Sequence, residues 1–297
     1  MNAIVLGVKR YEIHDGDGVR STVFVKGCPL RCKWCHNPES FSPNPEIGFY
    51  ATKCARCGEC VRACPSGAQK IEDENRAFDR SKCIRCGKCV NVCATGALRL
   101  FGTERSAESV AKEVLADKDM YDATGGGVTV SGGEPLLWPE FCRELFGTLK
   151  NHGVNTALDT SLYAPWEKIE PLLPLTDTFL VDLKAPDAAT HRLLTGVGND
   201  VILENLARLD GQGKRIEVRI PFVPPLNDKT PEAALPVLRS LKNLVGVKIL
   251  PYHDFAAAKY AALGMDYPAS SVPTPTEAQV AAARKLTADS GINVIEE

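Results

Sequence analysis

Two cysteine runs of identical spacing constrain the fold of this chain more than any other feature of its sequence. The chain reads CARCGECVRACP from Cys54 and CIRCGKCVNVCA from Cys83, and both runs are C-x2-C-x2-C-x3-C. In two-cluster [4Fe–4S] ferredoxins, three cysteines of each run bind one cluster and the fourth binds the other. A pair of zinc sites is the alternative, but zinc sites rarely use this spacing. The predicted ligand sets are Cys54, Cys57, Cys60 and Cys93 for one cluster and Cys83, Cys86, Cys89 and Cys64 for the other.

The cysteines as a whole point to metal binding rather than to disulfides. Eleven of the twelve lie between Cys28 and Cys93, in a chain of 297 residues that begins without the long apolar segment of a signal peptide. No stretch approaches the about 18 apolar residues of a membrane span, so we expect a cytoplasmic protein that does not bind membranes. The net charge of −2 gives no bulk electrostatic reason to bind nucleic acid. The remaining cysteine, Cys142, is expected to be a buried, inert thiol.

A third cysteine group precedes the two runs, in STVFVKGCPLRCKWCHNPES. Cys28, Cys32 and Cys35 supply three thiolates, whereas a cubane cluster has four irons, so one iron stays open for an exogenous ligand. Catalytic metal sites keep a free position in the same way. An incomplete zinc knuckle is the alternative. Ser21–Lys26, rich in β-branched residues, predicts a strand that ends at this cysteine loop.

The rest of the chain alternates between strand and helix patterns. Six strand–helix units predict a parallel sheet, in which the strand ends SGGEP, LDTS, DLK, RIPF and LPYH surround one mouth. Besides Ser21–Lys26, the predicted strands are Gly127–Ser131, Val154–Asp159, Thr178–Leu183, Arg215–Ile220 and Val245–Leu250. The predicted helices are Ser106–Met120, Pro139–Asn151, Val201–Gly211 and Pro231–Leu241.

These motifs together resemble a radical S-adenosylmethionine (SAM) enzyme and, within that superfamily, a glycyl radical enzyme activating enzyme. The resemblance rests on DGDGVRSTVFVKGCPLRCKWCHNPES, GGGVTVSGGEPLL, LDTS, DLKAPD, TGVGND, RIPFVPPLND and LPYHDFAAAKYAALGMDY. Members with a two-cluster ferredoxin insertion are most similar, because Glu46–Phe101 lies where they carry it. The implied fold is α/β: a partial (β/α)6 barrel made by residues 1–45 and 102–297, with a ferredoxin-like insertion at 46–101.

The resemblance also implies the chemistry. Cys28, Cys32 and Cys35 would bind three irons, and the methionine amino and carboxylate groups of SAM would chelate the fourth. Reductive cleavage of SAM would give a 5′-deoxyadenosyl radical, which removes the α-hydrogen of one glycine in a partner glycyl radical enzyme. The implied cofactors are three [4Fe–4S] clusters and SAM. The implied electron donor is a flavodoxin or a ferredoxin, and the implied setting is anaerobic.

Several further residues match SAM-binding positions of the family. Trp34 is expected to pack near adenine or to shield the cluster. Gly132, Gly133 and Glu134 of SGGEP are expected to meet the methionine amino group. Asp182 and Lys184 lie on one face of a strand, where a salt-bridged strand end is the alternative reading. His253 in PYH completes the implied SAM contacts.

Two smaller sites follow from the same resemblance. Asp159 and Thr160 resemble a monovalent cation site beside the methionine carboxylate, with Asp182 as a shared ligand; an ordinary polar strand end is the alternative. Asp15 and Arg219 match positions that grip the partner's glycine loop. Asp17 stands where the family has proline, and PPLND also departs from the usual proline–glycine form.

Two other functions stay open at this point. A radical SAM enzyme acting on a small molecule or a peptide is the first alternative, whereas a plain redox carrier leaves the three-cysteine site unexplained. The sequence does not identify the partner enzyme or the oligomeric state. It also does not tell whether the two extra clusters relay electrons or only stabilise the fold.

Overall fold

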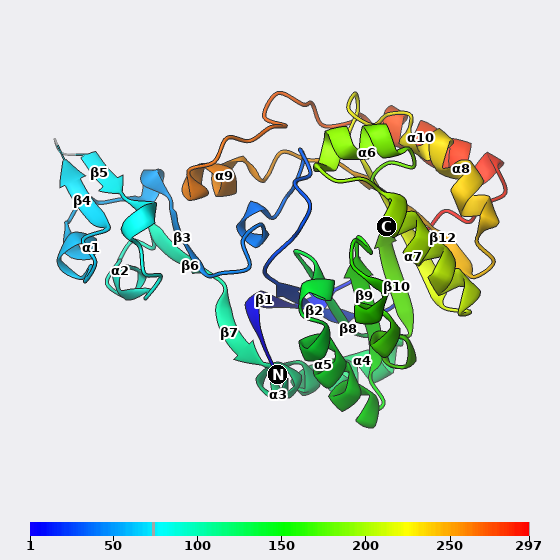
Figure 1. The fold of residues 1–297 in the computed structure, drawn as a ribbon, viewed down its shortest axis with the longest axis horizontal. Coiled ribbons are helices and arrows are strands. Elements are labelled where there is room, and N and C mark those ends of the chain that lie inside the picture. Colours follow the sequence, from blue (N-terminus) through cyan, green and yellow to red (C-terminus); the bar gives the residue numbers. More distant parts are fainter. Residues whose placement is uncertain (73–74, 297) are drawn as a thin grey trace.

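The chain is described by a computed structural model that covers residues 1–72 and 75–296. Its centre is a curved sheet of eight strands in the order β12-β11-β10-β9-β8-β2-β1-β7, which forms a partial barrel (Figure 1). Six neighbouring strands run parallel and confirm the predicted strand–helix units: β2 (Arg20–Val25), β8 (Gly127–Gly132), β9 (Asn155–Thr160), β10 (Thr178–Asp182), β11 (Arg215–Phe222) and β12 (Leu244–Pro251).

Two antiparallel strands extend the predicted parallel sheet. β1 (Asn2–Glu12) pairs with β2, and β7 (Thr103–Ser106) pairs with β1. The short loop between β1 and β2 leaves no room for a crossover helix, so the two strands form a hairpin. β7 brings the chain back from the cysteine-rich segment. The sheet is therefore mixed, with β1 and β7 added beside β2 at one edge of the parallel strands.

Helices cover the outer face of the sheet, and the main core lies between the two layers. The predicted helix Ser106–Met120 is interrupted by a 3-10 turn at Leu115–Asp117. There the buried Asp117 accepts hydrogen bonds from Arg10 Nε at 2.5 Å and from Ser21 Oγ at 3.2 Å. The α-helices of the barrel are α3 (Ala107–Val114), α4 (Lys118–Thr124), α5 (Pro139–Asn151), α6 (Ala188–Thr195), α7 (Asp200–Gly211), α8 (Thr230–Ser240), α9 (Ala257–Leu263) and α10 (Glu277–Asp289). The other 3-10 turns are Pro38–Ser40, Ala51–Lys53, Arg80–Lys82, Pro135–Leu137, Trp166–Lys168 and Glu170–Leu175.

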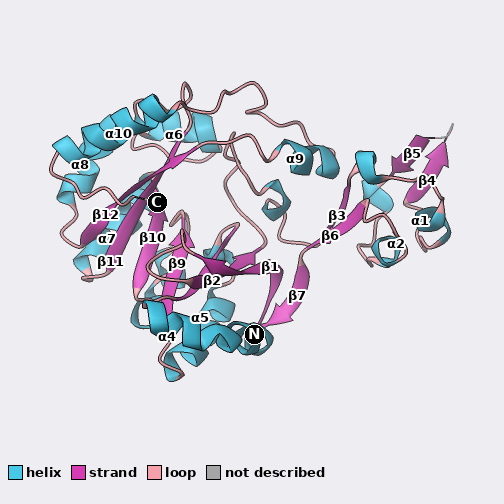
Figure 2. Cartoon of the chain, turned by 180° about the vertical axis from the view of Figure 1, so that it is seen from behind, coloured by secondary structure: helices cyan, strands magenta, loops and turns pink. Residues whose placement is uncertain are grey.

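The cysteine-rich segment forms a lobe beside the barrel (Figures 1 and 2). β3 (Glu46–Phe49) and β6 (Leu98–Phe101) pair at its base, and the hairpin of β4 (Gln69–Glu72) and β5 (Asn75–Phe78) lies at its outer end. Each cysteine run enters a short helix, α1 (Glu59–Arg62) or α2 (Lys88–Asn91). Among the residues that the structure describes, no helix is long and apolar enough to cross a lipid bilayer.

Candidate functional site

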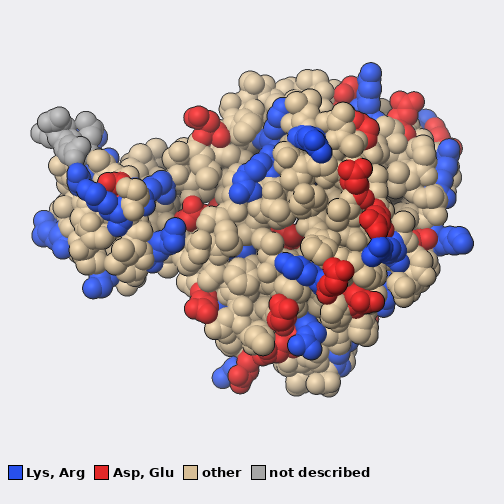
Figure 3. All heavy atoms as spheres, in the orientation of Figure 1, with Lys and Arg blue, Asp and Glu red and all other residues tan. Residues whose placement is uncertain are grey.

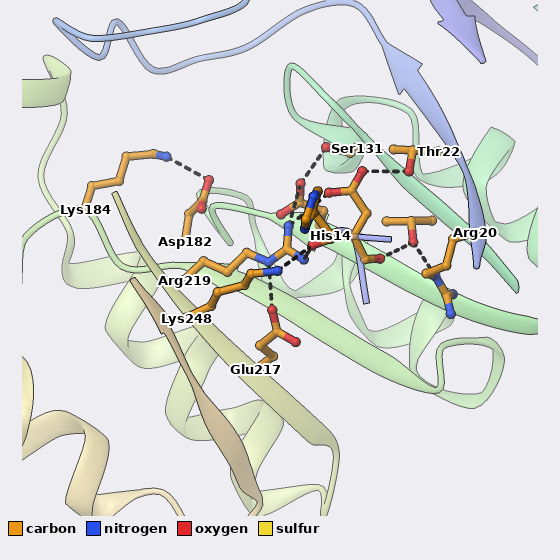
Figure 4. Close-up of polar contacts among 12 residues, drawn as sticks. His14, Arg20, Thr22, Ser131, Asp182, Lys184, Glu217, Arg219 and Lys248 are labelled. Carbon is orange, nitrogen blue, oxygen red and sulfur yellow. Dashed lines mark hydrogen bonds and ion pairs between the residues drawn. The ribbon is translucent and has the colours of Figure 1, made fainter. Parts of the chain in front are cut away.

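The carboxyl ends of the parallel strands surround a cavity of about 340 Å³. One wall is the loop after β2, which contributes all three cysteines of the first group, Cys28, Cys32 and Cys35. The facing walls are polar strand ends, and Figure 4 shows several of these side chains turned toward one another. The structure therefore brings together the cysteine loop and the strand-end motifs, which lie far apart in the sequence.

The cysteine loop has little regular structure, and neighbouring elements hold it in place. Lys26, fully buried at the end of β2, donates from Nζ to the backbone oxygens of Glu39 and Ser42 at 2.5 and 2.8 Å and to Glu46 Oε2 at 2.7 Å. Thr195, at the end of α6, accepts a hydrogen bond from the Arg31 backbone N–H at 2.7 Å. The loop is thus fixed from both sides of the cavity.

Lys259 on α9 is a further anchor that the sequence analysis did not single out. Its Nζ donates to the His36 backbone oxygen at 3.0 Å, to Asn37 Oδ1 at 2.9 Å and to Glu39 Oε1 at 2.6 Å. All three acceptors directly follow Cys35. No local pattern reveals this contact, because α9 lies more than 200 residues further along the chain.

The three thiols fit a cluster with one open iron. Burial raises the pKa of Cys28 to about 12 and that of Cys35 to about 12, and it also raises the pKa of Cys32. These thiolates therefore need a positive partner, which iron supplies. Across residues 1–72 and 75–296, no three metal-binding side chains converge on a point as a single ion requires. A cubane takes one thiolate per iron, so its ligands lie apart.

Gly132 and Gly133 line the cavity and also allow β8 to pack closely against β2. A Cβ atom on Gly133 would lie 2.0 Å from the Gly27 backbone oxygen, and one on Gly132 would lie 2.4 Å from the Val25 oxygen. The backbone N–H groups of Gly133 and Glu134 donate to Val25 at 2.9 Å and to Gly27 at 2.7 Å. The close backbone approach in this structure is to the neighbouring strand end, and the expected contact of these glycines with the methionine amino group stays a prediction.

Glu134 lies behind the cavity wall and does not line the cavity. Only 1% of the residue is exposed, and its carboxylate accepts hydrogen bonds from Thr160 Oγ1 at 2.6 Å and from Ser161 Oγ at 2.5 Å. The backbone N–H groups of Ser161 and Leu136 also donate to it, at 2.9 and 3.0 Å. Burial raises the pKa of Glu134, and these hydrogen bonds oppose that shift. In this structure the carboxylate ties β8 to β9, and its expected contact with the methionine ammonium stays a prediction.

Asp182, Lys184 and Asp159 all line the cavity. Lys184 Nζ donates to Asp182 Oδ2 at 2.8 Å. Burial lowers the pKa of Lys184, but Asp182 and the nearby cysteines outweigh this effect and raise it, so the ammonium is charged. Asp159 Oδ2 accepts a hydrogen bond from Ser131 Oγ at 2.5 Å. Burial raises the pKa of Asp159 to about 7, against the opposing effect of Arg219.

Asp15 and Arg219 contact each other at the cavity, with Arg219 Nη1 and Asp15 Oδ1 3.3 Å apart. Arg219 is only 4% exposed, and it also donates to the His14 backbone oxygen at 2.8 Å and to Glu217 Oε1 at 2.9 Å. Thr22 Oγ1 donates to Asp15 Oδ2 at 2.7 Å. The two residues expected to hold a partner loop thus form one ion pair.

Trp34 and His253 differ in where they lie. Trp34 is buried and lines the cavity beside the cysteines. His253 lines an adjoining cavity of about 540 Å³ instead, between β1, β6 and α9. Its ring stacks on His36 with centroids 3.9 Å apart, and its backbone oxygen accepts a hydrogen bond from His36 Nε2 at 2.8 Å. Phe24, His36 and Asn37 line both cavities, which are therefore neighbours.

The lobe contains two further cavities, each lined by four cysteines. One, of about 150 Å³, is lined by Cys54, Cys57, Cys60 and Cys93, and the other by Cys64, Cys83, Cys86 and Cys89. These groupings are the two ligand sets predicted from the spacing, with the fourth cysteine of each run exchanged. Four thiols around a small, largely apolar cavity fit an iron–sulfur cluster. Outside the lobe, Cys142 is fully buried, as expected.

The chain is similar over most of its length to known proteins. The family model of the radical SAM superfamily matches residues 22–235. The (2S)-3-sulfopropanediol dehydratase activating enzyme of Klebsiella oxytoca is 40% identical, over 91% of this chain and 88% of its own length. The trans-4-hydroxy-L-proline dehydratase activating enzyme of Clostridioides difficile is 37% identical, over 99% and 98%. Among solved structures, Streptococcus suis SuiB bound to precursor peptide SuiA has a TM-score of 0.52 at 12% identity, over 91% of this chain and 46% of that chain. This last likeness concerns the fold alone.

Proposed function

Because the chain belongs to the glycyl radical enzyme activating enzymes of the radical SAM superfamily, we propose that the cavity at the carboxyl ends of its parallel strands is the active site. The protein activates a partner glycyl radical enzyme with a [4Fe–4S] cluster and SAM. When bound, these cofactors supply one-electron cleavage of SAM and a radical that takes the α-hydrogen of a glycine. The observation that carries the assignment is the three-cysteine wall facing charged strand ends.

The residues around the cavity divide the binding of the cofactors between them. Cys28, Cys32 and Cys35 hold three irons, and the anchors Lys26 and Lys259 keep their loop in one conformation. Lys184, charged because the pKa of its ammonium is raised, pairs with the methionine carboxylate, and Asp182 beside it lies within reach of a cationic group. The Gly132 and Gly133 backbone and the Trp34 ring complete the pocket. His253 acts from the adjoining cavity, through its stack on His36.

The monovalent cation site is proposed with fewer ligands than the family resemblance implied. The hydroxyl of Thr160 is directed to Glu134, whereas Asp159 lines the cavity close to the Asp182 strand end. We therefore assign a monovalent cation to Asp159 and Asp182, with the Thr160 side chain contributing only indirectly through Glu134.

The partner's glycine loop enters the same cavity. Arg219 and Asp15 form the floor of the cavity as a buried ion pair. The guanidinium can donate to the backbone C=O groups of an extended loop, and the carboxylate can accept from its N–H groups. Relatives whose names give different partner enzymes are similarly close to this chain, at 40% and 37% identity, so identity alone does not select the partner.

Residues 46–101 form a separate ferredoxin-like domain with two further [4Fe–4S] clusters, while residues 1–45 and 102–297 form the catalytic domain. The two four-cysteine cavities support this proposal. A flavodoxin or ferredoxin supplies the electron.

The test is an anaerobic activation assay. The reconstituted protein is mixed with SAM, reductant and candidate glycyl radical enzymes, starting with (2S)-3-sulfopropanediol dehydratase and trans-4-hydroxy-L-proline dehydratase. Electron paramagnetic resonance should report a glycyl doublet on one partner, and the Cys32→Ala variant should give none while its lobe clusters remain. Cleavage of SAM without a glycyl signal on any candidate partner would favour a small-molecule substrate.

A further inference from the structure

The lobe carries a surplus of positive charge that the rest of the chain lacks. Residues 46–101 contain ten Lys and Arg against six Asp and Glu, a net charge of +4, whereas the remaining residues contain 25 against 31, a net charge of −6. Figure 3 shows Lys and Arg spread over the lobe, at the left, with little Asp or Glu among them on that face. A polarised charge of this kind steers an oppositely charged partner toward one end of a molecule.

The basic residues recur at the same positions of the two cysteine runs. A lysine precedes the first cysteine of each run, and an arginine precedes the second, as in Lys53 and Arg56. Arg56 and Arg85 both have positive φ, 55° and 60°, which is uncommon for a residue with a side chain. Both arginines are exposed, and so are the cysteines that follow them, Cys57 and Cys86. Each loop thus presents a cation next to a solvent-accessible thiol.

The first run lies at the end of the lobe that points away from the barrel. Its cavity is bordered by Phe49 and Leu98, whereas the cavity of the second run is bordered by Ile47. Strands β3 and β6 meet the barrel at their other end, where Lys26 binds Glu46. Figure 1 likewise places α1 farther from the barrel than α2. The first run is therefore the more accessible of the two to a large partner.

This outer end combines charge with a small apolar patch. Lys53, Arg56 and Arg62 are exposed, and Arg62 Nη2 donates to the Cys57 backbone oxygen at 3.4 Å. Ile71, 42% exposed, lines the same cavity. The one described acidic side chain within Lys53–Arg62, Glu59, is paired with Arg62. Electron-transfer complexes use small interfaces in which charge sets the approach.

We propose that this outer end, made by Lys53, Arg56, Arg62 and Ile71 around Cys57, docks the acidic face of a one-electron carrier protein of the flavodoxin or ferredoxin class. The inference rests on the proposed clusters of the lobe. One electron leaves the carrier and one arrives at the cluster held by Cys54, Cys57, Cys60 and Cys93, with no bond made or broken and no proton moved. The lobe is thus the entry point for electrons.

The competing explanation is local: the cations only neutralise the negative charge of a cluster bound by four thiolates. The two explanations differ in what a charge reversal changes. Docking residues alter the rate with a charged protein donor and its dependence on salt. Residues that only neutralise the cluster alter its reduction by every donor alike.

The experiment measures anaerobic reduction of the full-length, cluster-loaded protein by stopped-flow absorbance. The variant Lys53→Glu/Arg56→Glu is compared with Lys112→Glu/Lys285→Glu, which makes the same charge change at exposed positions on α3 and α10. Each is reduced by pre-reduced flavodoxin and, separately, by small uncharged photoreduced 5-deazariboflavin. Binding of oxidised flavodoxin is followed by calorimetry. Iron content and cluster spectra are recorded first, so that absence of the lobe clusters is recognised as a failure of the proposed function itself.

The lobe variant should lose about tenfold or more in its second-order rate with flavodoxin at low salt, and the loss should shrink as salt rises. The control should change less than about twofold, and 5-deazariboflavin should reduce all three proteins alike. An unchanged flavodoxin rate with clusters present would overturn the docking site. So would an equal loss with both reductants, because the two cations would then act on the cluster rather than on the carrier.

Discussion

Two carboxylates beside the cavity have different roles although both follow a parallel strand. Asp182 lines the cavity and pairs with Lys184, so it remains within reach of a ligand. Glu134 lies behind the wall, where two hydroxyls and two backbone N–H groups donate to it. A carboxylate with its hydrogen bonds complete has little left for a cofactor. At the scale of residues, we therefore expect the neighbours of each acid, rather than its place in a motif, to decide which acid binds the cofactor.

Glu134→Gln should destabilise the protein. The amide keeps the volume but turns one acceptor into a donor that faces Thr160 or Ser161, so buried hydrogen bonds are lost at about 1–3 kcal/mol each. The thermal midpoint of the cluster-loaded variant, measured anaerobically, should fall, while its affinity for SAM changes little. A variant as stable as the wild type that no longer binds SAM would instead make Glu134 a direct ligand.

Lys184→Met should weaken SAM binding with the cluster intact. The substituted side chain at position 184 fills a similar volume but carries no charge. It therefore removes the cation that we assign to the carboxylate of SAM. Loss of a buried charge-assisted hydrogen bond of about 1.5–3 kcal/mol corresponds to roughly a tenfold to hundredfold weaker affinity. Equilibrium binding of SAM to the reconstituted variant measures it, with iron content as the control. Unchanged affinity would show that Lys184 serves only Asp182.

At the scale of elements, the active site depends on how strand ends and helices meet. The cysteine loop follows β2, yet α6 and α9 supply much of its support. The end of β8 approaches β2 so closely that only glycine fits at Gly132 and Gly133. Packing between elements thus sets the position of the thiols. The substitutions Gly133→Ala and Lys259→Met test this packing, each against a control variant.

Gly133→Ala should disrupt the contact between β8 and β2. The added Cβ would overlap the Gly27 backbone oxygen, which has no flexible side chain to move away. We expect a loss of several kcal/mol, in the range of severe overpacking. Gly147→Ala on α5 is the matched control, because nothing lies within 4 Å of its new Cβ, and helix propensity predicts a gain of about 0.5–1 kcal/mol. Chemical denaturation compares the two, and equal effects would contradict the close-packing account.

Lys259→Met should loosen the cysteine loop without unfolding the barrel. Three acceptors after Cys35 lose their donor, and Glu39 is left buried and unpaired. The cluster should therefore be lost faster on exposure to air, by several-fold, as followed by absorbance. Lys285→Met, on the exposed side of α10, is the control and should decay at the wild-type rate. An equal decay of wild type and Lys259→Met would remove Lys259 as a positioning residue.

At the scale of the whole molecule, the lobe joins the barrel through neighbouring strand ends. Glu46 and Phe101 are paired residues of β3 and β6, so the chain leaves and re-enters the barrel at nearly the same place. Few polar contacts cross the boundary; Lys26 binds Glu46, and Arg80 Nη2 donates to the Ala262 oxygen at 3.1 Å. Such a junction is typical of a domain inserted into a loop.

Replacing residues 46–101 by a short Gly-Ser linker should leave a folded barrel. Lys26 keeps its bonds to Glu39 and Ser42 after the excision, so the cysteine loop stays anchored. The shortened chain should hold about four irons and still bind SAM, whereas the full chain should hold about twelve. Iron analysis and SAM titration of both proteins measure this. A shortened chain that aggregates or binds no iron would mean that the lobe is part of the barrel's fold.

The sequence by itself determined the features that depend on the spacing of the cysteines and on the periodicity of apolar residues. The cysteine intervals predicted three groups of thiols, and the structure places the two four-cysteine sets in separate cavities. The strand–helix alternation predicted all six parallel strands, because strand period and apolar content are local properties. The shared mouth follows from parallel topology alone, because parallel strands end at the same edge of the sheet.

Tertiary structure decided the contacts that join distant segments. Lys259 binds the cysteine loop, Arg219 pairs with Asp15, and Glu134 turns away from the cavity to Thr160 and Ser161. Each of these partners lies at least 26 residues from the residue it contacts, so no local pattern could reveal them. The break after α3 has the same origin, because Asp117 binds Arg10 and Ser21, about 100 residues earlier in the chain. These hydrogen-bond partners are fixed by packing, which acts between elements and not along the chain. The hairpin of β1 and β2 is different, because it pairs Glu12 with Arg20 across a short loop and is a local contact.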